Sequence, residues 1–314
     1  MKNIIIDTDT GSDDAVALVM ALRDPSVKIL AVTTVFGNVD LETATQNALI
    51  SIHQAGTYQP PLYKGLAKPL VSEFEPVSDI EDFDNFSKMG FSFSKQLPET
   101  EHAVDALIRL IKDGDGTIEL VTLGPLANVA MAMIQSPEVM KKLPRITIMG
   151  GAHFYTNAHT AMAEYNIMAD PEAADVVFQF GVPITLVTLE ACQENSAPLD
   201  KQEIARFREA GSAARFCMDC SQVELGLMDS SVAFPNLELP DPVAYAVFSK
   251  PELAKTVFDS QTIIELGGTY SRGTTIFRTR VGFFETVPLE VNSRVVTEVD
   301  GRAFKDFMFG LLKD

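Results

Sequence analysis

Four carboxylates stand within eight residues near the N-terminus, in the run Asp7-Thr8-Asp9-Thr10-Gly11-Ser12-Asp13-Asp14. One explanation is helix capping, because an Asp cap stabilises a helix by roughly 0.5–2 kcal/mol. Capping accounts for Asp13 or Asp14. It does not account for Asp7 and Asp9, which extend a strand and crowd like charges together. Crowded carboxylates take up protons or share a hard cation. The spacing therefore predicts a metal site or acid–base chemistry.

The elements around this run alternate between strand and helix. Residues 2–7 form a short β-branched run, residues 13–23 have helical spacing, and residues 27–35 are typical of a strand buried on both faces. The alternation continues in helix 41–55, strand 118–123, helix 126–135, strand 146–149, helix 171–180 and strand 184–188. It predicts an α/β fold with one open, mostly parallel sheet and helices on both faces. Strands are expected across 261–299, then a closing helix over 301–313. We expect residues 1–314 to form a single domain.

In open sheets of this kind, ligands bind beyond the carboxyl ends of the strands. The segments expected there hold most of the unusual polar residues: 7–14, 36–38, 123–125, 150–166 and 190–195. Residues 65–100 are loop-like, and a long loop of this kind is often a lid. Its residues Phe83, Phe91 and Phe93 would either stack on a ligand or pack in the ordinary way.

Composition limits the partners and the compartment. The chain is 46% hydrophobic and carries a formal net charge of −18, which argues against a nucleic acid or an acidic membrane as partner. A small neutral or cationic substrate suits this charge better. No signal-peptide core and no long apolar run occurs, and three cysteines argue against a disulfide framework. We therefore expect a cytoplasmic protein.

The strand followed by Asp-x-Asp-x-Gly-x-Asp-Asp-Ala resembles the N-terminal signature of the inosine–uridine-preferring nucleoside hydrolase family. Further stretches agree in order and spacing: Thr33–Asn38, Met149–Gly151, Ala163–Asn166 with Asp170–Ala174, and Asp241-Pro242. The similarity reaches about residue 250. It implies the Rossmann-like nucleoside hydrolase fold and hydrolysis of a ribonucleoside into base and ribose. It also implies a homo-oligomer, either a dimer or a tetramer.

The resemblance further implies roles for individual residues. Asp9 would bind Ca²⁺ and act as the base that activates a metal-bound water. Asp14 and Asp241 would be carboxylate ligands of the calcium, and the carbonyl of Leu123 would complete the protein ligands. Five side chains would bind the ribose hydroxyls: Asp13, Asn38, Asn157, Glu164 and Asn166. Met149 would pack beneath the sugar. Asn157 lies in a loop that is one residue longer than the family pattern.

The residues expected on the nucleobase side depart from this family. Pro240 stands where many members have His, and Glu190-Ala191-Cys192-Gln193 stands where they often show Asp-x-Thr-His. Either His153 or His159 would then serve as the acid that protonates the leaving base, or both are ordinary loop histidines. The pair Cys217-x-x-Cys220 invites a zinc or redox reading, but no second Cys pair is near and the segment is typical of a helix.

Two alternatives to hydrolysis remain open at this point. A calcium- and ribose-binding relative without turnover would explain the absence of the usual acid. An aspartate-nucleophile phosphatase would explain Asp7-x-Asp9 after a strand, but that family has Thr or Val two positions after the second Asp, where this chain has Gly11. A nucleoside panel with a reducing-sugar assay separates the first alternative from hydrolysis.

Overall fold

The strands belong to one sheet whose order places the N-terminal strand near its middle. The computed structural model describes residues 1–73, 84–91, 95–153, 162–193, 197–221, 236–281 and 288–314. The strands in it are β1 (Lys2–Thr8), β2 (Val27–Thr34), β3 (Leu62–Lys64), β4 (Glu119–Thr122), β5 (Ile146–Met149), β6 (Ile184–Val187), β7 (Ala254–Ile264), β8 (Thr275–Arg278) and β9 (Ser293–Val299). Their spatial order is β3-β2-β1-β4-β5-β6-β9-β7-β8.

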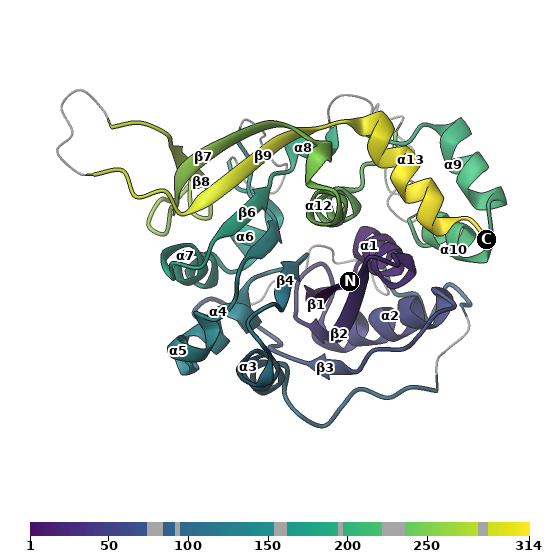
Figure 1. Cartoon of the computed structure of the whole chain (residues 1–314), viewed down its shortest axis with the longest axis horizontal. Coiled ribbons are helices and arrows are strands. Elements are labelled where there is room, and N and C mark those ends of the chain that lie inside the picture. The colour runs from purple at the N-terminus through teal and green to yellow at the C-terminus, as the bar shows by residue number, and fades with distance from the viewer. Residues whose placement is uncertain (74–83, 92–94, 154–161, 194–196, 222–235, 282–287) are drawn as a thin grey trace.

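Most neighbouring strands in this sheet are parallel. Every pair from β3 to β9 in the spatial order is parallel, whereas β7 pairs antiparallel with β9 and β8 antiparallel with β7. These last strands extend the sheet on one side of the molecule (Figure 1). The predicted open, mostly parallel sheet is confirmed, and its first six strands have the order of the doubly wound Rossmann-type fold.

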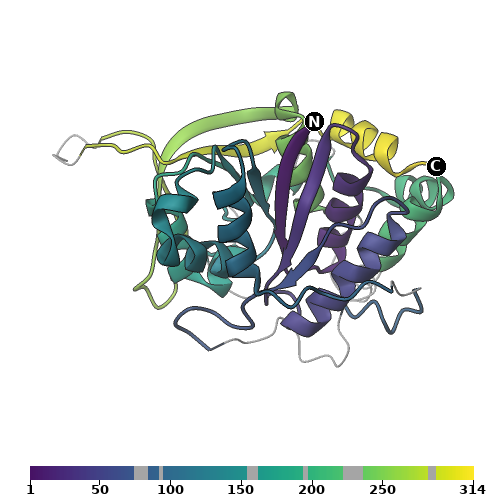
Figure 2. The same cartoon turned by 60° about the horizontal axis from the view of Figure 1, so that its bottom comes forward.

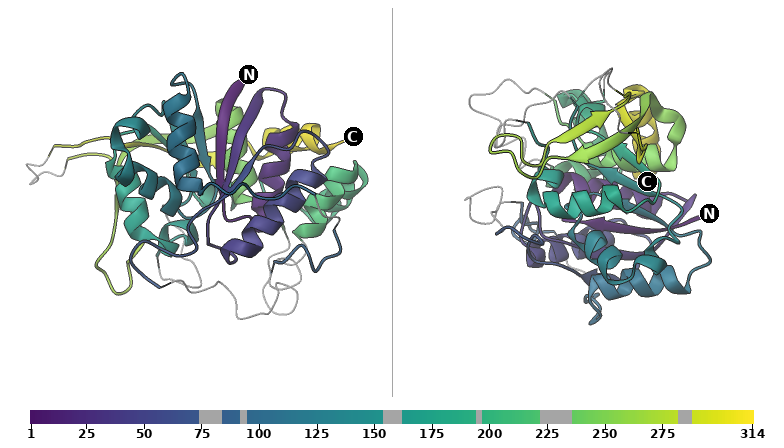
Figure 3. Two further views of the ribbon diagram at one scale, coloured as in Figure 1. Left: turned by 90° about the horizontal axis from the view of Figure 1, so that it is seen from below. Right: turned by 90° about the vertical axis from the view of Figure 1, so that its left-hand side faces the viewer.

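Helices cover both faces of the sheet, as predicted (Figures 1 and 3). On one face, apolar side chains pack around α1 (Ser12–Arg23), α2 (Leu41–Gln54), α10 (Ser212–Cys220), α12 (Pro240–Ser249) and α13 (Gly301–Leu312). On the other they pack around α3 (Ala103–Asp113), α4 (Ala127–Gln135) and α7 (Pro171–Gln179), with the short α5 (Pro137–Met140) beside them. The remaining short elements are α6 (Tyr165–Ala169), α8 (Glu190–Gln193), α9 (Lys201–Glu209) and the 3₁₀ helix η1 (Pro251–Leu253).

The buried strand β1 shows why continuous apolar runs form the middle of the sheet. Ile4, Ile5 and Ile6 are fully buried; Ile4 and Ile6 pack into one core and Ile5 into the other. Successive strand side chains point to opposite faces, so a strand covered on both faces is apolar throughout. β1 and β2 run side by side away from the N-terminus and carry the following loops to the opposite edge of the sheet (Figure 2).

Sequence reasoning placed most of the elements that it named within a few residues of their observed bounds. It expected the C-terminal strands only from residue 261, whereas β7 begins at Ala254. It expected a helix to start at His102, which is the N-cap of α3, but it assigned no element to β3. β3 is only three residues long, and its strand state depends on parallel pairing with β2. Cys217 and Cys220 lie on α10, where both side chains are buried in the core and the Cys220 thiol donates to Cys217 O (3.2 Å), which agrees with the structural interpretation of that pair. Among the described residues, no helix is long and apolar enough to cross a membrane.

Candidate active site

The site lies where the direction of strand addition reverses. From β1 the chain builds outward through β2 to β3, then returns to place β4 on the other side of β1. Such a switch point opens a crevice at the carboxyl ends of the two central strands. The loops are tied together there, because Leu123 N–H donates to Asp7 O (2.8 Å) and Val35 N–H donates to Thr8 O (3.1 Å).

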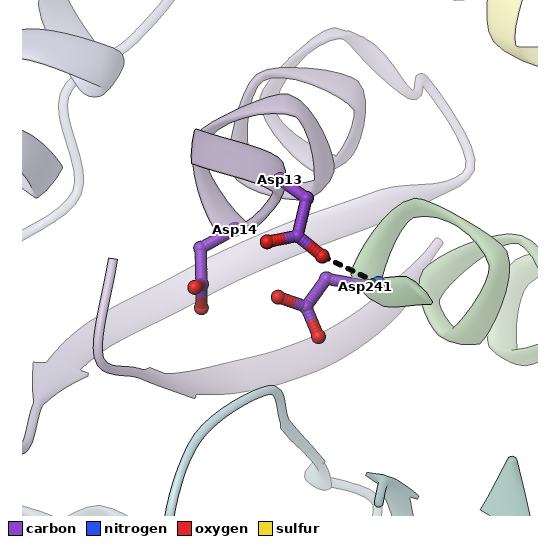
Figure 4. Close-up of side chains that lie close together, drawn as sticks. All are labelled: Asp13, Asp14 and Asp241. Atoms are coloured by element: carbon purple, nitrogen blue, oxygen red, sulfur yellow. Dashed lines mark hydrogen bonds between the residues drawn. The ribbon is translucent and has the colours of Figure 1, made fainter. Parts of the chain in front are cut away.

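Three carboxylates meet at this edge. One oxygen from each of Asp13, Asp14 and Asp241 lies within 4.8 Å of the others, and all three residues are buried (Figure 4). Asp13 and Asp14 come from the first turn of α1, and Asp241 from the first turn of α12. The two helices are joined here, because Asp241 N–H donates to Asp13 Oδ2 (3.2 Å). Positive ends of helix dipoles favour negative charge at this point.

Asp9 is enclosed by two glycines. A Cβ atom on Gly37 would stand 1.9 Å from Asp9 Oδ2, and one on Gly124 would stand 2.5 Å from Asp9 Oδ1. The Asp9 carboxylate therefore occupies the space that a side chain at position 37 or 124 would need. Asn38 N–H donates to Asp9 Oδ2 (2.6 Å), whereas Oδ1 is buried and has no hydrogen-bond partner among the described residues.

The capping explanation for the acidic run is confirmed for Asp14, which forms a capping box with Gly11, and is wrong for Asp13. The N-cap of α1 is Gly11, so Asp13 and Asp14 lie inside the helix. Asp14 accepts hydrogen bonds from Gly11 N–H (2.9 Å) and from the Thr8 hydroxyl, which hold its carboxylate in place. Sequence reasoning missed this role of Thr8, because a threonine at the end of a strand carries no signal of its own.

Behind the site, Asp7 has a structural role that sequence reasoning did not separate from that of Asp9. Its Oδ1 accepts hydrogen bonds from Asn128 Nδ2 (2.8 Å) and from the Thr33 hydroxyl. Asn128, on α4, also donates to Thr34 O (3.0 Å) and accepts from Leu66 N–H (2.9 Å). These contacts tie the ends of β1 and β2 to α4 and to the loop at Leu66.

The residues expected to bind ribose come together at the same edge. Asn166 Nδ2 donates to Leu123 O (2.7 Å) and lies 3.3 Å from Met149 Sδ. Glu164 caps α6 and accepts from Asn166 N–H (2.9 Å) and Gly151 N–H (2.8 Å). Asn38 is half-buried beside Asp9. Asn157 lies outside the described residues.

Tyr165 is a further site contact that sequence reasoning did not name. Its hydroxyl donates to Gly37 O (2.6 Å), which links α6 to the loop that encloses Asp9. The charges of Asp9 and Glu164, together with burial as the larger cause, raise the pKa of Tyr165. The tyrosine is therefore neutral and holds the loop as a hydrogen-bond donor.

His153 and Phe91 pack against aromatic side chains, and His102 caps a helix. The His153 ring packs against Phe258 and Phe277, with centroids 5.3 and 5.4 Å away. His53 is exposed on α2, and His102 caps α3 by accepting a hydrogen bond from Val104 N–H. Phe91 meets Phe216 edge-on at 4.8 Å, which favours ordinary packing. His159, Phe83 and Phe93 lie outside the described residues.

Burial gives the site carboxylates a high affinity for positive charge. It raises the pKa of Asp9 to about 8, and the charges of Asp13 and Glu164 add to the shift against the hydrogen bond from Asn38. Burial, followed by the charges of neighbouring carboxylates, raises the pKa of both Asp14 and Asp241 well above the usual range. These groups must bind protons or a cation.

The donor set fits a hard cation. The oxygens Asp9 Oδ1 and Asp241 Oδ1 are buried without a hydrogen-bond partner among the described residues, next to carboxylates whose pKa values are raised. A buried anionic oxygen without a partner is costly, and coordination to a metal removes that cost. All of these donors are oxygens, which alkaline-earth cations prefer to nitrogen or sulfur.

Comparison with known proteins decides the family. The profile described as inosine-uridine preferring nucleoside hydrolase matches residues 4–306. The chain belongs to this family. It is therefore an enzyme that hydrolyses nucleosides, and the phosphatase alternative is excluded.

Known nucleoside hydrolases resemble this one along its length. The chain is 30% identical to the pyrimidine-specific ribonucleoside hydrolase RihA of Salmonella gallinarum, covering 97% of this chain and 96% of the relative. It is 32% identical to probable uridine nucleosidase 1 of Oryza sativa subsp. japonica, over 79% and 77%. A purine-preferring ribonucleoside hydrolase from Gardnerella vaginalis superposes with a TM-score of 0.88 at 28% identity, covering 99% of this chain and 98% of that one. These names disagree about the preferred base.

The raised carboxyl pKa values predict how the stability of this nucleoside hydrolase depends on pH without metal. Burial raises the pKa values of Asp9, Glu164 and Asp7 to about 8, 7 and 6, above those in an unfolded chain. Between about pH 4 and 8 the folded state therefore binds more protons, and the free energy of unfolding falls as pH rises. We expect the Tm in chelator to drop by several degrees from pH 5 to 8.

Differential scanning fluorimetry in EDTA and in calcium checks this expectation. Because the cation binds the ionised carboxylates, calcium should raise the Tm most at pH 8 and least at pH 5. A Tm in EDTA that is constant or rising across this window would contradict the assignment of raised pKa values to the site.

Proposed function

We propose that this nucleoside hydrolase is a calcium-dependent ribonucleosidase in which Asp9 takes the proton from the attacking water. The observation that carries the proposal is Asp9 Oδ1, a buried carboxylate oxygen without a hydrogen-bond partner among the described residues, near the cluster of Asp13, Asp14 and Asp241. A carboxylate that a bound cation keeps ionised at neutral pH can accept a proton from the attacking water.

The proposed metal ligands are Asp9, Asp14, Asp241 and the carbonyl of Leu123. Three carboxylates and a carbonyl leave coordination positions for substrate and solvent, because calcium takes six to eight oxygens in flexible geometry. When bound, calcium would neutralise the carboxylates and lower the pKa of a nearby water. The hydrogen bond that Leu123 O accepts from Asn166 leaves that carbonyl a second lone pair.

The proposed ribose contacts are Asp13, Asn38, Asn157, Glu164 and Asn166, with Met149 beneath the sugar. Breaking an N-glycosidic bond leaves an oxocarbenium-like sugar, and carboxylates aimed at the ring stabilise this positive charge. Asp13 and Glu164 are more than nine-tenths buried, so their charges act with little screening by solvent. The side chains therefore support both hydroxyl binding and charge stabilisation.

Metal removal tests the calcium part of the proposal. We expect chelator to abolish hydrolysis and lower the Tm, and calcium to restore both, because a ligand bound only by the folded state stabilises it. Elemental analysis of the purified protein, with activity and Tm measured in EDTA and then in calcium or magnesium, gives the result. Full activity without any divalent ion would refute the metal site.

We expect the enzyme to discriminate more strongly between sugars than between nucleobases. A substrate without the 2′-hydroxyl would leave buried polar partners unpaired, at about 1–3 kcal/mol for each group. We therefore expect kcat/KM for 2′-deoxyuridine or 2′-deoxyinosine to be at least about tenfold below that of the ribonucleoside. Reducing-sugar assays on matched pairs measure this ratio. Equal rates within each pair would contradict the ribose contacts.

A further inference from the structure

Asp84 is held in an unusual conformation beside the site. Among the described residues it is the one non-glycine residue with a positive φ, at 50°. Its backbone is fixed from α2, because Asn47 Nδ2 donates to Asp84 O (2.8 Å) and to Thr10 O (2.9 Å), while Asn47 Oδ1 accepts from Phe86 N–H (3.0 Å). Strained conformations that the surroundings enforce are concentrated at functional sites.

The carboxyl of Asp84 uses one oxygen and leaves the other free. Its Oδ2 accepts a hydrogen bond from Ser12 N–H (2.8 Å) at the start of α1. Its Oδ1 is buried with no hydrogen-bond partner among the described residues, although the residue is only 5% exposed. A cap on α1 needs one oxygen, so capping leaves Oδ1 unexplained. A buried oxygen without a partner is costly unless a ligand meets it.

The position of Asp84 is close to the proposed sugar contacts. A Cβ atom on Gly11 would stand 2.9 Å from Asp84 Oδ2 and 3.0 Å from Asn38 Nδ2, so both side chains approach the same backbone atom. Asp13, the residue after Ser12, is near enough for its charge to raise the pKa of Asp84. Asp84 therefore borders the side chains proposed to hold the sugar.

Hydrolysis also needs a proton for the departing base. When the N-glycosidic bond breaks, its electron pair goes to the base nitrogen, which leaves easily only if protonated. Pro240 cannot donate a proton, and the described His53, His102 and His153 lie in a helix, at a cap and in an aromatic cluster. Among the described residues considered so far, none can protonate the departing base, and the Oδ1 oxygen of Asp84 has no assigned function.

We propose that Asp84 is the catalytic residue that donates a proton from Oδ1 to the departing base, an inference that rests on the proposed hydrolysis of ribonucleosides. The proton moves from Oδ1 to the base nitrogen as the bond to the sugar breaks. Asp9 takes one proton from the water, whose oxygen forms the new bond to the sugar. Transfer of that proton through solvent to Asp84 restores both groups.

The protonation state of Asp84 supports this role. Burial raises its pKa to about 7, the hydrogen bond from Ser12 N–H lowers it, and the charge of Asp13 raises it further. Asn47, which packs against Asp84 from α2, is neutral. A substantial share of Asp84 therefore carries its proton at neutral pH, and Oδ1 is the oxygen left to bear it.

Asp84→Asn tests the proposal, because Asn accepts the hydrogen bond from Ser12, tolerates a positive φ and has no acidic proton. We expect kcat for uridine and inosine to fall at least about a hundredfold, and kcat for 4-nitrophenyl riboside to change less than about threefold. A nitrophenolate leaves with little protonation, so this substrate does not need the acid.

Asp24→Asn is the matched control. Asp24 is the C-cap of the same helix α1, is also 5% exposed, and accepts hydrogen bonds from Ser26, Tyr245 and Ser249. It should leave the ratio of the two substrates unchanged even if it lowers the Tm. Should Asp84→Asn fail to fold, Asp84→Gly removes the carboxyl and permits the positive φ.

Two results would overturn the assignment of Asp84. Equal losses on both substrates would give Asp84 a purely structural role, and unchanged kcat on nucleosides with a raised KM would make it a binding group. Inactivity of the wild-type protein on both substrates would instead contradict the proposed hydrolysis of ribonucleosides, on which the assignment of Asp84 rests.

Discussion

Asp9→Asn is expected to lower kcat for ribonucleosides by at least about a hundredfold while the protein stays folded. The amide has the shape of the carboxylate and still accepts the hydrogen bond from Asn38 N–H, so the surrounding loops keep their positions. It cannot take a proton from water at neutral pH. Because the amide nitrogen would then face the proposed calcium, kinetics are measured in excess calcium. The remaining loss should appear in kcat, because the proton transfer belongs to the transition state rather than to substrate binding.

Steady-state kinetics and a thermal melt on the same preparation check the Asp9 prediction. Asp40→Asn is the matched control, since Asp40 lies just beyond Asn38 and caps α2 through Glu42 and Thr43 on the surface. Its kcat should stay within about twofold of wild type. Turnover by Asp9→Asn at the wild-type rate would show that another group activates the water.

Gly37→Ala is expected to reduce kcat by a similar factor without changing any polar group. The added Cβ would stand 1.9 Å from Asp9 Oδ2 and 2.6 Å from Asp9 Cβ, so the whole side chain or the loop must move. A displacement of about 1 Å in a reacting group can cost about a hundredfold in rate. Overpacking of this kind costs about 1–3 kcal/mol, so the Tm should also fall by several degrees.

Gly310→Ala provides the comparison for this steric prediction. Gly310 lies in α13, and an added Cβ there meets nothing within 4 Å. Alanine favours helix over glycine by about 1 kcal/mol, so this variant should keep full activity and a Tm no lower than wild type. If Gly37→Ala behaved like Gly310→Ala, the enclosure of Asp9 would have no part in catalysis.

Most of the fold could be predicted from the sequence because the patterns that indicate helices and strands are local. Apolar runs such as Ile4–Ile6 and helical spacing in 13–23 depend on neighbours within a few residues. Alternation of the two restricts the topology to a parallel sheet with crossover helices. The sequence alone could not predict β3, whose three residues form a strand only because β2 lies beside them.

Sequence reasoning also brought together the acidic run and Asp241, but by resemblance rather than by spacing. Asp13 and Asp241 are 228 residues apart, and no periodicity predicts that Asp241 N–H donates to Asp13. Neither glycine beside Asp9 could be recognised as a steric requirement, because Gly37 and Gly124 come from different loops. Their importance follows from two strand ends converging on one side chain.

By itself, then, the sequence determined the alternation of elements, the charge of the N-terminal loop and the edge of the sheet where a site would form, since each depends on residue type and short-range order. Only the tertiary structure decided which carboxylates face one another and which, such as Asp7, hold neighbouring elements in place by hydrogen bonds. It also placed Asp84 against Ser12, which lies 72 residues away in the sequence. The physical reason is that a pKa and a free hydrogen-bonding valence depend on burial and on distant neighbours, which residue order does not encode locally.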